Sequence, residues 1–331
     1  MENVLQLCFP QIRTRQQVID DIMSKEYLKE TYEQWNKKEQ EGFLDICTGV
    51  RGVKILSDSF FKEIFDPEVV PERLEELLSL LLEQKVKILK VLPNDSTRIT
   101  DETSLVIMDI VVELEDHSIA NIECQRIGYL FPRQRAACYS SDLLLRQYKR
   151  VRGEKGKSFS YKHIKKVYNI IFYEKSPSEF HCYPEYSVHR SKQQTDTGVE
   201  IELLQEFIFV ALDNAKGIYE NKGIRNKLDA WLIFLSDDKP DTIVKLIERY
   251  PEFRVMYEEI YDMFMSTERV MNMWSKELLE LDKNTERYMM DEMQKEIDEK
   301  KAELEAKKAE LEAKDAELEL LKRELAKLKN Q

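Results

Sequence analysis

A short alternating segment of the sequence places two acids and an amide at spacings suited to phosphate chemistry. Residues 104–126 read SLVIMDIVVELEDHSIANIECQR, and their richness in Val and Ile predicts two strands joined by a tight polar turn around Asp116. In such a hairpin the numbers of paired residues sum to 232, so Asp109 lies directly opposite Glu123. Gln125 lies two residues further along the second strand, on the same face.

The apolar residues of this hairpin alternate with the polar ones and predict which face is buried. They are Val106, Met108, Ile110, Val112 and Leu114 on the first strand and Ala120, Ile122 and Cys124 on the second. Because successive side chains of a strand point to opposite faces, Asp109, Glu123 and Gln125 point together away from that apolar face.

Two carboxylates that face each other across a sheet repel, and a divalent cation between them would remove the repulsion. Carboxylate oxygens suit hard cations such as Mg²⁺, which keep several waters when bound. A bound water could then attack a phosphodiester while the metal neutralises the developing charge. The alternative is that Asp109 and Glu123 face solvent on a half-exposed sheet.

The charge of the chain is unevenly distributed. The 331 residues carry a formal net charge of −12, yet residues 126–166 contain twelve Lys or Arg and only two acids, Asp142 and Glu154. A basic segment inside an acidic protein is typical of a localised phosphate-binding surface. A solvated helix face followed by a Lys-rich loop is the alternative.

The remaining patterns predict an α/β domain between helical segments. Helices are expected within 15–45 and at 57–65, 71–84 and 132–151, strands at 167–174 and 206–213, and further helices from about residue 224 onward. We therefore expect four regions: a helical N-terminal segment (1–50), the α/β domain (51–215), a helical region (216–290) and a charged heptad-repeat helix (291–331).

The last region repeats every seven residues, with Leu304, Leu311, Leu318 and Leu325 in phase. Lys occupies the partner positions of the first heptads, so a full apolar seam is present only in the final two. A charged, solvent-facing helix is therefore an alternative to a coiled coil. The regular Leu stripe favours self-association into a homo-oligomer.

Several classes of protein are disfavoured. The N-terminus lacks the pattern of a signal peptide, and no stretch approaches eighteen uncharged apolar residues, so we expect a cytoplasmic protein without a membrane span. Five scattered cysteines without a CxxC pair favour a reduced protein with neither disulfides nor a structural zinc site. No GxxxxGK[ST] or GxGxxG stretch occurs, which disfavours an ATPase or a dinucleotide enzyme.

The order of these elements and their motifs resembles the PD-(D/E)XK nuclease superfamily and, within it, the transposase-like branch of recombination-promoting nucleases. The matching features are SDSFFKEIF (57–65), the Asp of LVIMDIVV (105–112), NIECQ (121–125) and RQRAACYSSDLLLRQY (133–148). The resemblance covers most of residues 55–290. It implies a restriction-endonuclease-like core, in which helices flank a mixed sheet, metal-dependent DNA cleavage and a helical C-terminal extension.

Residue by residue, the resemblance implies that Asp109 and Glu123 ligate Mg²⁺ or Mn²⁺, with the backbone carbonyl of Cys124 as a third ligand. Gln125 stands where most of the superfamily has Lys, so it would orient the attacking water without contributing positive charge. Arg133 and Arg135 of the following helix are candidates for that charge, because a guanidinium matches a phosphate bidentately. Ordinary surface charge is their alternative role.

The same resemblance implies DNA as the partner, contacted by Arg126, Arg133, Arg135, Lys149 and Arg150. The missing Lys and the net charge of −12 keep a second hypothesis open, a catalytically inactive DNA-binding or assembly module on the same fold. RNA in place of DNA is also open, because phosphate contacts carry no sugar or base information. Two further acids, Asp58 and Glu63, are candidates to complete the site, and exposed helix positions are the favoured alternative for both.

Overall fold

The computed structural model describes residues 3–93, 109–127, 133–191 and 193–279, together with positions 297, 300, 304 and 307. The chain divides into two compact units, Met1–Leu278 and Leu279–Gln331. In the second unit the five described residues, at positions 279, 297, 300, 304 and 307, are helical, and the rest of the predicted heptad helix lies outside the described residues. The coiled coil and the region boundaries expected at 50, 215 and 290 therefore stay predictions.

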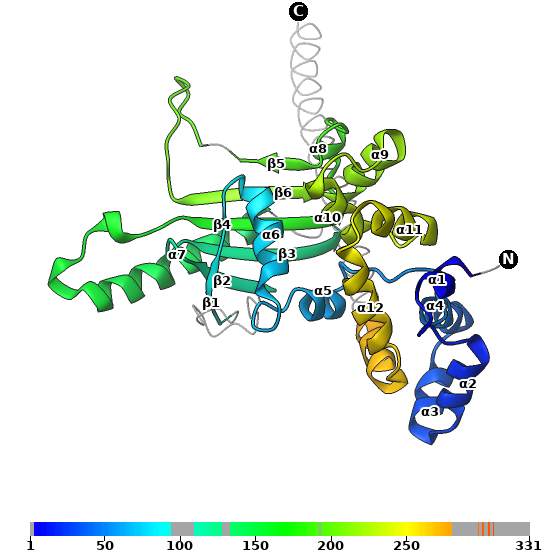
Figure 1. Ribbon diagram of the computed structural model, residues 1–331. Helices are drawn as coiled ribbons and strands as arrows, with labels where there is room; N and C mark the ends of the chain where they lie inside the picture. The colour runs from blue at the N-terminus through cyan, green and yellow to red at the C-terminus, as the bar shows by residue number, and fades with distance from the viewer. Residues whose placement is uncertain are drawn as a thin grey trace, which may run out of the picture. The chain divides into compact units, whose positions relative to one another are not determined.

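The first unit is built around one mixed sheet (Figure 1). Its strands are β1 (Ile88–Val91), β2 (Ile110–Leu114), β3 (Ile119–Ile127), β4 (Val167–Lys175), β5 (Val188–Arg190) and β6 (Gln205–Ala211), in the order β1-β2-β3-β4-β6-β5. The three central strands β3, β4 and β6 are parallel, whereas β1, β2 and β5 pair antiparallel with their neighbours. The α/β class and the mixed sheet expected from the sequence are confirmed.

The β2–β3 hairpin has the predicted turn and register. Ile110 pairs with Ile122 and Val112 with Ala120, so the paired numbers sum to 232 as expected. In the turn, Asp116 accepts a hydrogen bond from the backbone N–H of Ser118 at 2.9 Å, and His117 adopts a φ of 67°. This local Asx geometry closes the hairpin at the residue that the sequence indicates.

Both faces of the sheet are covered by helices. The helices of the first unit are α1 (Val4–Cys8), α2 (Arg15–Met23), α3 (Glu26–Gln34), α4 (Lys37–Cys47), α5 (Asp58–Ile64), α6 (Pro71–Leu82), α7 (Arg133–Lys155), α8 (Ser178–His181), α9 (Leu212–Lys222), α10 (Lys227–Ser236), α11 (Pro240–Arg249) and α12 (Phe253–Met263), and residues 267–279 are also helical. On one face, the main core joins α5, α6 and α10 to the apolar residues of the hairpin that are described, Ile110, Val112, Leu114, Ala120, Ile122 and Cys124. The other two residues predicted for this face, Val106 and Met108, lie outside the described residues. On the other, α7 packs over Val111, Ile119 and Ile171.

Several elements differ from the sequence-based expectation, among them the helices α1, α8 and α9, where no helix was predicted. The strands β1 and β5 were not predicted, because each has four residues or fewer and too short a repeat for its period to stand out. The strand predicted to run to residue 213 ends at Ala211, where α9 begins. No helix among the described residues combines the length and apolar composition needed to span a membrane.

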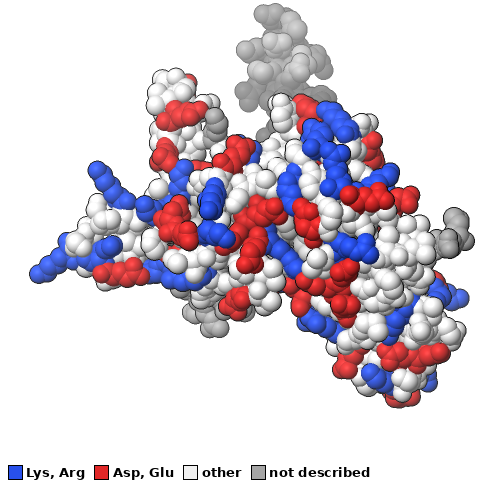
Figure 2. Space-filling model, in the orientation of Figure 1, with Lys and Arg blue, Asp and Glu red and all other residues white. Residues whose placement is uncertain are grey.

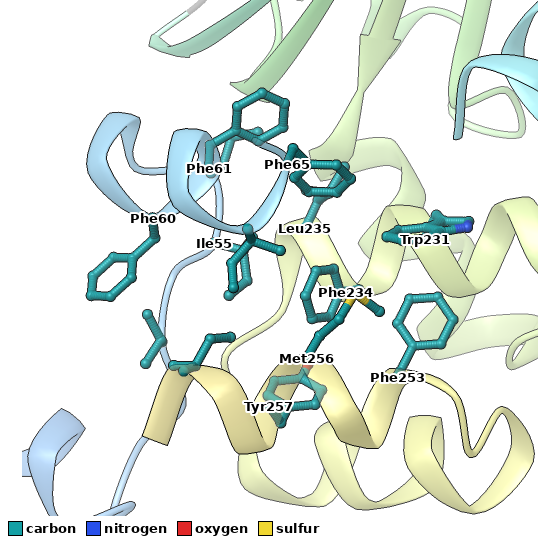
Figure 3. Close-up of a cluster of buried hydrophobic side chains, with 14 of the residues drawn as sticks. Ile55, Phe60, Phe61, Phe65, Trp231, Phe234, Leu235, Phe253, Met256 and Tyr257 are labelled. Atoms are coloured by element: carbon teal, nitrogen blue, oxygen red, sulfur yellow. The ribbon is translucent and has the colours of Figure 1, made fainter. Parts of the chain in front are cut away.

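A cluster of aromatic side chains fixes α5 against the C-terminal helices (Figure 3). Phe61 and Phe65 of α5 stack with ring centroids 4.8 Å apart, and Phe65 lies 5.5 Å from Trp231 of α10. Phe61 also lies 6.3 Å from Phe172 of β4. Because large aromatic rings contribute much of the burial free energy of a core, these contacts hold α5 at the end of the sheet where β2 begins.

Gly52 packs closely against the segment that contains Asp238 and Ile243, so a substitution here tests the packing of the core. Its N–H donates to the backbone oxygen of Asp238 at 2.7 Å, and a Cβ at this position would lie 2.8 Å from the same oxygen and clash with Ile243. We expect Gly52→Ala to lower the free energy of unfolding by about 1–3 kcal/mol, as overpacked cores do. The matched control is Gly217→Ala in α9, where a Cβ meets nothing within 4 Å.

The free energy of unfolding of the control should rise by up to about 1 kcal/mol, because Ala has a higher helix propensity than Gly. Urea denaturation measures both, and equal effects would contradict the packing argument.

Candidate active site

The predicted acid pair comes together at the beginning of β2. Asp109 directly precedes β2, and the register of the hairpin places it opposite Glu123 of β3. The backbone N–H of Cys124 donates to Asp109 Oδ2 at 2.7 Å, which fixes the carboxylate against the neighbouring strand. Cys124 itself packs against the main core, so its side chain lies on the face opposite to Glu123, as its position in the strand predicts.

Glu123 is almost fully buried, with 2% of its surface exposed. Burial, and then the charge of Asp109, raise the pKa of Glu123 well above its usual value, although the Arg135 guanidinium acts in the opposite direction. Within the described part of the chain, Glu123 Oε1 is buried without a hydrogen-bond partner. These observations exclude the solvent-exposed alternative for Glu123 and leave a buried carboxylate that needs a counter-charge.

Lys62 is a member of this site that the sequence did not reveal. Its Nζ lies 3.5 Å from Asp109 Oδ1, and its side chain is 37% exposed. It comes from α5, whose buried face carries Phe61 and Phe65. In the segment SDSFFKEIF the sequence analysis considered only the two acids, Asp58 and Glu63, and not Lys62.

The other side of the acid pair faces α7. Arg135, in the first turn of that helix, donates its Nε–H to the hydroxyl of Tyr139, and its guanidinium lies 5.2 Å from the centre of the Tyr139 ring. Tyr139 is buried over β3 and β4, and burial raises the pKa of its hydroxyl. Arg135 is therefore held close enough to Glu123 to act on its charge, which favours a role at the site over ordinary surface charge.

Gln125 lies two residues after Glu123 on β3 and is half-buried. It pairs in register with Tyr173 of β4 and shares a sheet face with Glu123 and Asn121. Asn121 is fully buried on this face, and its side chain is close enough to Glu123 to act, by hydrogen bonding, against the rise in the pKa of Glu123. The face that carries the acid pair is thus polar along β3 even though α7 covers it.

Two of the predicted phosphate-binding arginines hold ion pairs within the fold. Arg126 contacts Glu174 at 3.1 Å and also pairs with Glu277. Burial opposes ionisation of Glu174, but Lys54 and Arg126 hold its pKa below its usual value. Arg150 contacts Glu113 at 2.6 Å. These charges are committed to carboxylates, so they are poorly placed to contact a phosphate backbone.

The remaining predicted residues lie at or near α7 and α5. Lys149 is exposed on α7, whereas the side chain of Arg133 lies outside the described part of the structure, as does that of Asp58. Glu63 is 44% exposed and pairs with Arg269, so its predicted exposed position is confirmed.

The donor set at the acid pair is suited to a hard divalent cation. Within the described residues no group of three His, Cys, Asp or Glu side chains is arranged to hold a metal. Two carboxylates with one buried, unpartnered oxygen nevertheless offer the ligand type that Mg²⁺ and Mn²⁺ prefer, and Mg²⁺ is commonly held by one or two carboxylates. The residues present therefore fit such an ion.

Comparison with known proteins agrees with this arrangement. A search of curated proteins and a search of solved structures each gave no significant match. The family model described as PD-(D/E)XK nuclease family transposase matches residues 55–300, which include α5, the acid-bearing hairpin and α7. Because the match covers more than half of the sequence, the chain belongs to the PD-(D/E)XK nuclease family of transposases.

Proposed function

We propose that this chain is a Mg²⁺- or Mn²⁺-dependent endonuclease that hydrolyses DNA phosphodiester bonds at Asp109, Glu123 and Gln125. Membership of a nuclease family supports the reaction class. The observation that carries the site is the buried Glu123 opposite Asp109, where burial, and then the charge of Asp109, raise the pKa of Glu123. A structural role alone gives no reason to bury an acid beside another acid.

The metal would be held by Asp109, Glu123 and the backbone carbonyl of Cys124. A bound Mg²⁺ or Mn²⁺ supplies a water of lowered pKa and neutralises the charge that develops on the phosphate. The Cys124 N–H orients the Asp109 carboxylate for this role by its hydrogen bond of 2.7 Å.

The neighbouring side chains complete the chemistry. Gln125 shares a face with Glu123, so its amide can accept a hydrogen bond from the nucleophilic water and orient it. Lys62 Nζ lies 3.5 Å from Asp109 Oδ1, so its ammonium would lie beside a phosphate bound at the acid pair. Gln125 is neutral and cannot supply positive charge as the phosphate becomes more negative. The ammonium of Lys62 would supply it instead. Arg135 adds a second positive charge from α7.

DNA binding would use the exposed basic residues of α7 and the following loop, including Lys149. Each phosphate that these residues neutralise releases counterions, so affinity should fall steeply with salt concentration. Self-association through the C-terminal heptad helix remains part of the proposal.

A catalytically inactive DNA-binding or assembly module is the second candidate. Gln125 in place of Lys favours it, since one charge of the superfamily site is missing from β3. The placement of Lys62 beside Asp109 weakens that argument, because the charge is present from another element.

A plasmid-nicking assay separates the two functions. Wild-type protein is incubated with supercoiled plasmid in Mg²⁺, Mn²⁺, Ca²⁺ or EDTA, and DNA binding is measured in EDTA on the same preparation. The nuclease proposal expects nicking with Mg²⁺ or Mn²⁺ and none with EDTA. Folded protein that binds DNA but does not cleave it in the presence of any of these metals would establish the module instead.

A further inference from the structure

The second half of α7 extends beyond the sheet as an arm. Ala136, Tyr139 and Leu143 are buried against the strands, whereas Leu145 is 55% exposed. We define the arm as residues 148–163, which include the end of α7 and the 3₁₀ turns Gly156–Ser158 and Tyr161–His163. Figure 1 shows it as the green projection at the left, beyond the ends of the strands.

The base of the arm is firmly attached. Arg150 contacts Glu113 of β2 at 2.6 Å, and the buried Gln147 accepts a hydrogen bond from the backbone N–H of Lys165 at 2.6 Å. Gln147 also donates to the backbone oxygen of His117 in the β2–β3 turn. These bonds hold the two ends of the arm together, so its outer residues keep a defined position relative to the sheet.

Three aromatic rings are grouped on the arm. Tyr148 and Tyr161 lie nearly parallel, with 14° between their planes and 6.0 Å between their centroids. Phe159 meets both rings edge-on, at 5.5 Å and 5.4 Å. Tyr161 is nevertheless 72% exposed. Tyr148 and Phe159 contact the Tyr161 ring and hold it in place, while most of the residue stays open to solvent, so a flat apolar ring surface is accessible on the arm.

Positive charge surrounds these rings. In sequence, Glu154 is the single acid of the arm. The basic residues of the arm that are exposed are Lys149, Arg152, Lys155, Lys157 and Lys162. Figure 2 shows Lys and Arg gathered at this end of the molecule. An exposed ring among cations is the combination by which proteins bind single-stranded nucleic acid, with phosphates on the cations and bases stacked on the ring.

We propose that the arm binds DNA with unpaired bases, and that Tyr161 stacks on one of them. In a duplex both faces of each internal base are covered by its neighbours, so a protruding ring gains a stacking partner only at a single strand, a gap or a frayed end. The choice of DNA as the polymer rests on the proposed function. At about 1.5 Å per residue, the helix between Arg135 and Tyr148 spans about 20 Å. In duplex DNA, with about 3.4 Å per nucleotide along each strand, this length of helix corresponds to about six nucleotides.

The test compares the affinities of Tyr161 variants for single-stranded and duplex DNA. Fluorescence anisotropy is measured in EDTA with a labelled dT₂₀ strand and a blunt hairpin duplex of equal charge. Tyr161→Ala should weaken binding of the single strand by about tenfold or more, since each stacked base contributes strongly to affinity. Tyr161→Phe keeps the ring and should retain wild-type affinity. Tyr183→Ala removes another exposed tyrosine, 57% exposed and outside the arm, and is the matched control.

Tyr161→Ala with wild-type affinity for dT₂₀, or with equal losses on both DNAs, would overturn the proposal. An rU₂₀ strand bound at least about tenfold more tightly than dT₂₀ would overturn the choice of DNA, because stacking itself is indifferent to the sugar. The binding measurement does not require cleavage, so its result is independent of whether the nuclease proposal is correct. If the wild-type protein does not nick plasmid and Tyr161→Ala still weakens binding of dT₂₀, the nuclease proposal fails and the single-strand proposal stands.

Discussion

Asp109→Ala protein is expected to bind DNA as tightly as wild type and to nick plasmid on the order of a thousandfold more slowly, as when a site loses a group that stabilises charge in the transition state. The substitution removes one of the two proposed metal ligands and the acceptor of the Cys124 N–H bond. Time courses of nicking in Mg²⁺ and Mn²⁺, with DNA binding measured in EDTA, provide both numbers. Cleavage by purified Asp109→Ala protein at the wild-type rate would remove Asp109 from the site.

Glu123→Gln should lose cleavage to the same degree while making the protein more stable. The pKa of Glu123 is raised above its value in the unfolded chain, so the folded state holds its proton more tightly. Without metal, ionising this buried group lowers the free energy of unfolding. The loss begins as pH rises past the unfolded pKa of about 4.3, and it is complete above the folded pKa. Each unit of separation between the two pKa values amounts to about 1.4 kcal/mol.

Thermal unfolding in EDTA at a series of pH values tests this second effect. The advantage of Glu123→Gln over wild type should be absent near pH 4 and should grow as the pH rises. The matched control is Glu30→Gln, an exposed acid of α3 that should show no such trend. A Glu123→Gln protein less stable than wild type at pH 8 would show that its carboxylate is already well paired, and the argument for a metal at this point would fail.

Lys62→Met is expected to reduce the rate of nicking by about a hundredfold or more at saturating DNA and metal. An ammonium aimed at developing negative charge typically contributes an effect of this size. The ion pair with Asp109 is partly exposed, so its loss should change stability by no more than about 1 kcal/mol. The decrease in rate should therefore appear in protein with a nearly unchanged melting temperature.

Lys38→Met, at an exposed position in α4, serves as the control for removing one positive charge. Lys62→Arg separates charge from shape, because it keeps the charge on a larger, planar group. Partial activity in Lys62→Arg and none in Lys62→Met would fit an electrostatic role. If Lys62→Met nicks plasmid as fast as wild type, the positive charge comes from elsewhere, and Arg135 becomes the next residue to change.

The hairpin could be read from the sequence because its information is local. Apolar and polar side chains alternate with a period of two on both sides of Asp116, and that pattern determines the register and the shared face of Glu123 and Gln125. The burial of Glu123 could not be read in the same way. It depends on α7, which returns across the sheet after the hairpin and covers the polar face with Tyr139 and Leu143.

The partners of Lys62 and of the arginines could not be predicted from the sequence, because these contacts join residues that are far apart in the chain. Lys62 is far from Asp109 in sequence, and only the packing of Phe61 and Phe65 brings them together. The charge count over 126–166 does not show that Arg126 and Arg150 pair with carboxylates of the same chain, and their predicted contact with DNA stays a prediction. The partners of Arg126 and Arg150 are Glu277 and Glu113, and neither pairing follows from local pattern.

The ion pair between Arg126 and Glu277 ties two distant parts of the chain into one mechanical element. Arg126 directly follows Gln125 on β3, and Glu277 lies in the helical stretch 267–279, which the chain continues into the heptad repeats. A pull or twist applied to that helix acts on the strand that carries Glu123 and Gln125 through a single side-chain contact. The position of the helical stretch 267–279 and the alignment of the acid pair are therefore not mechanically independent.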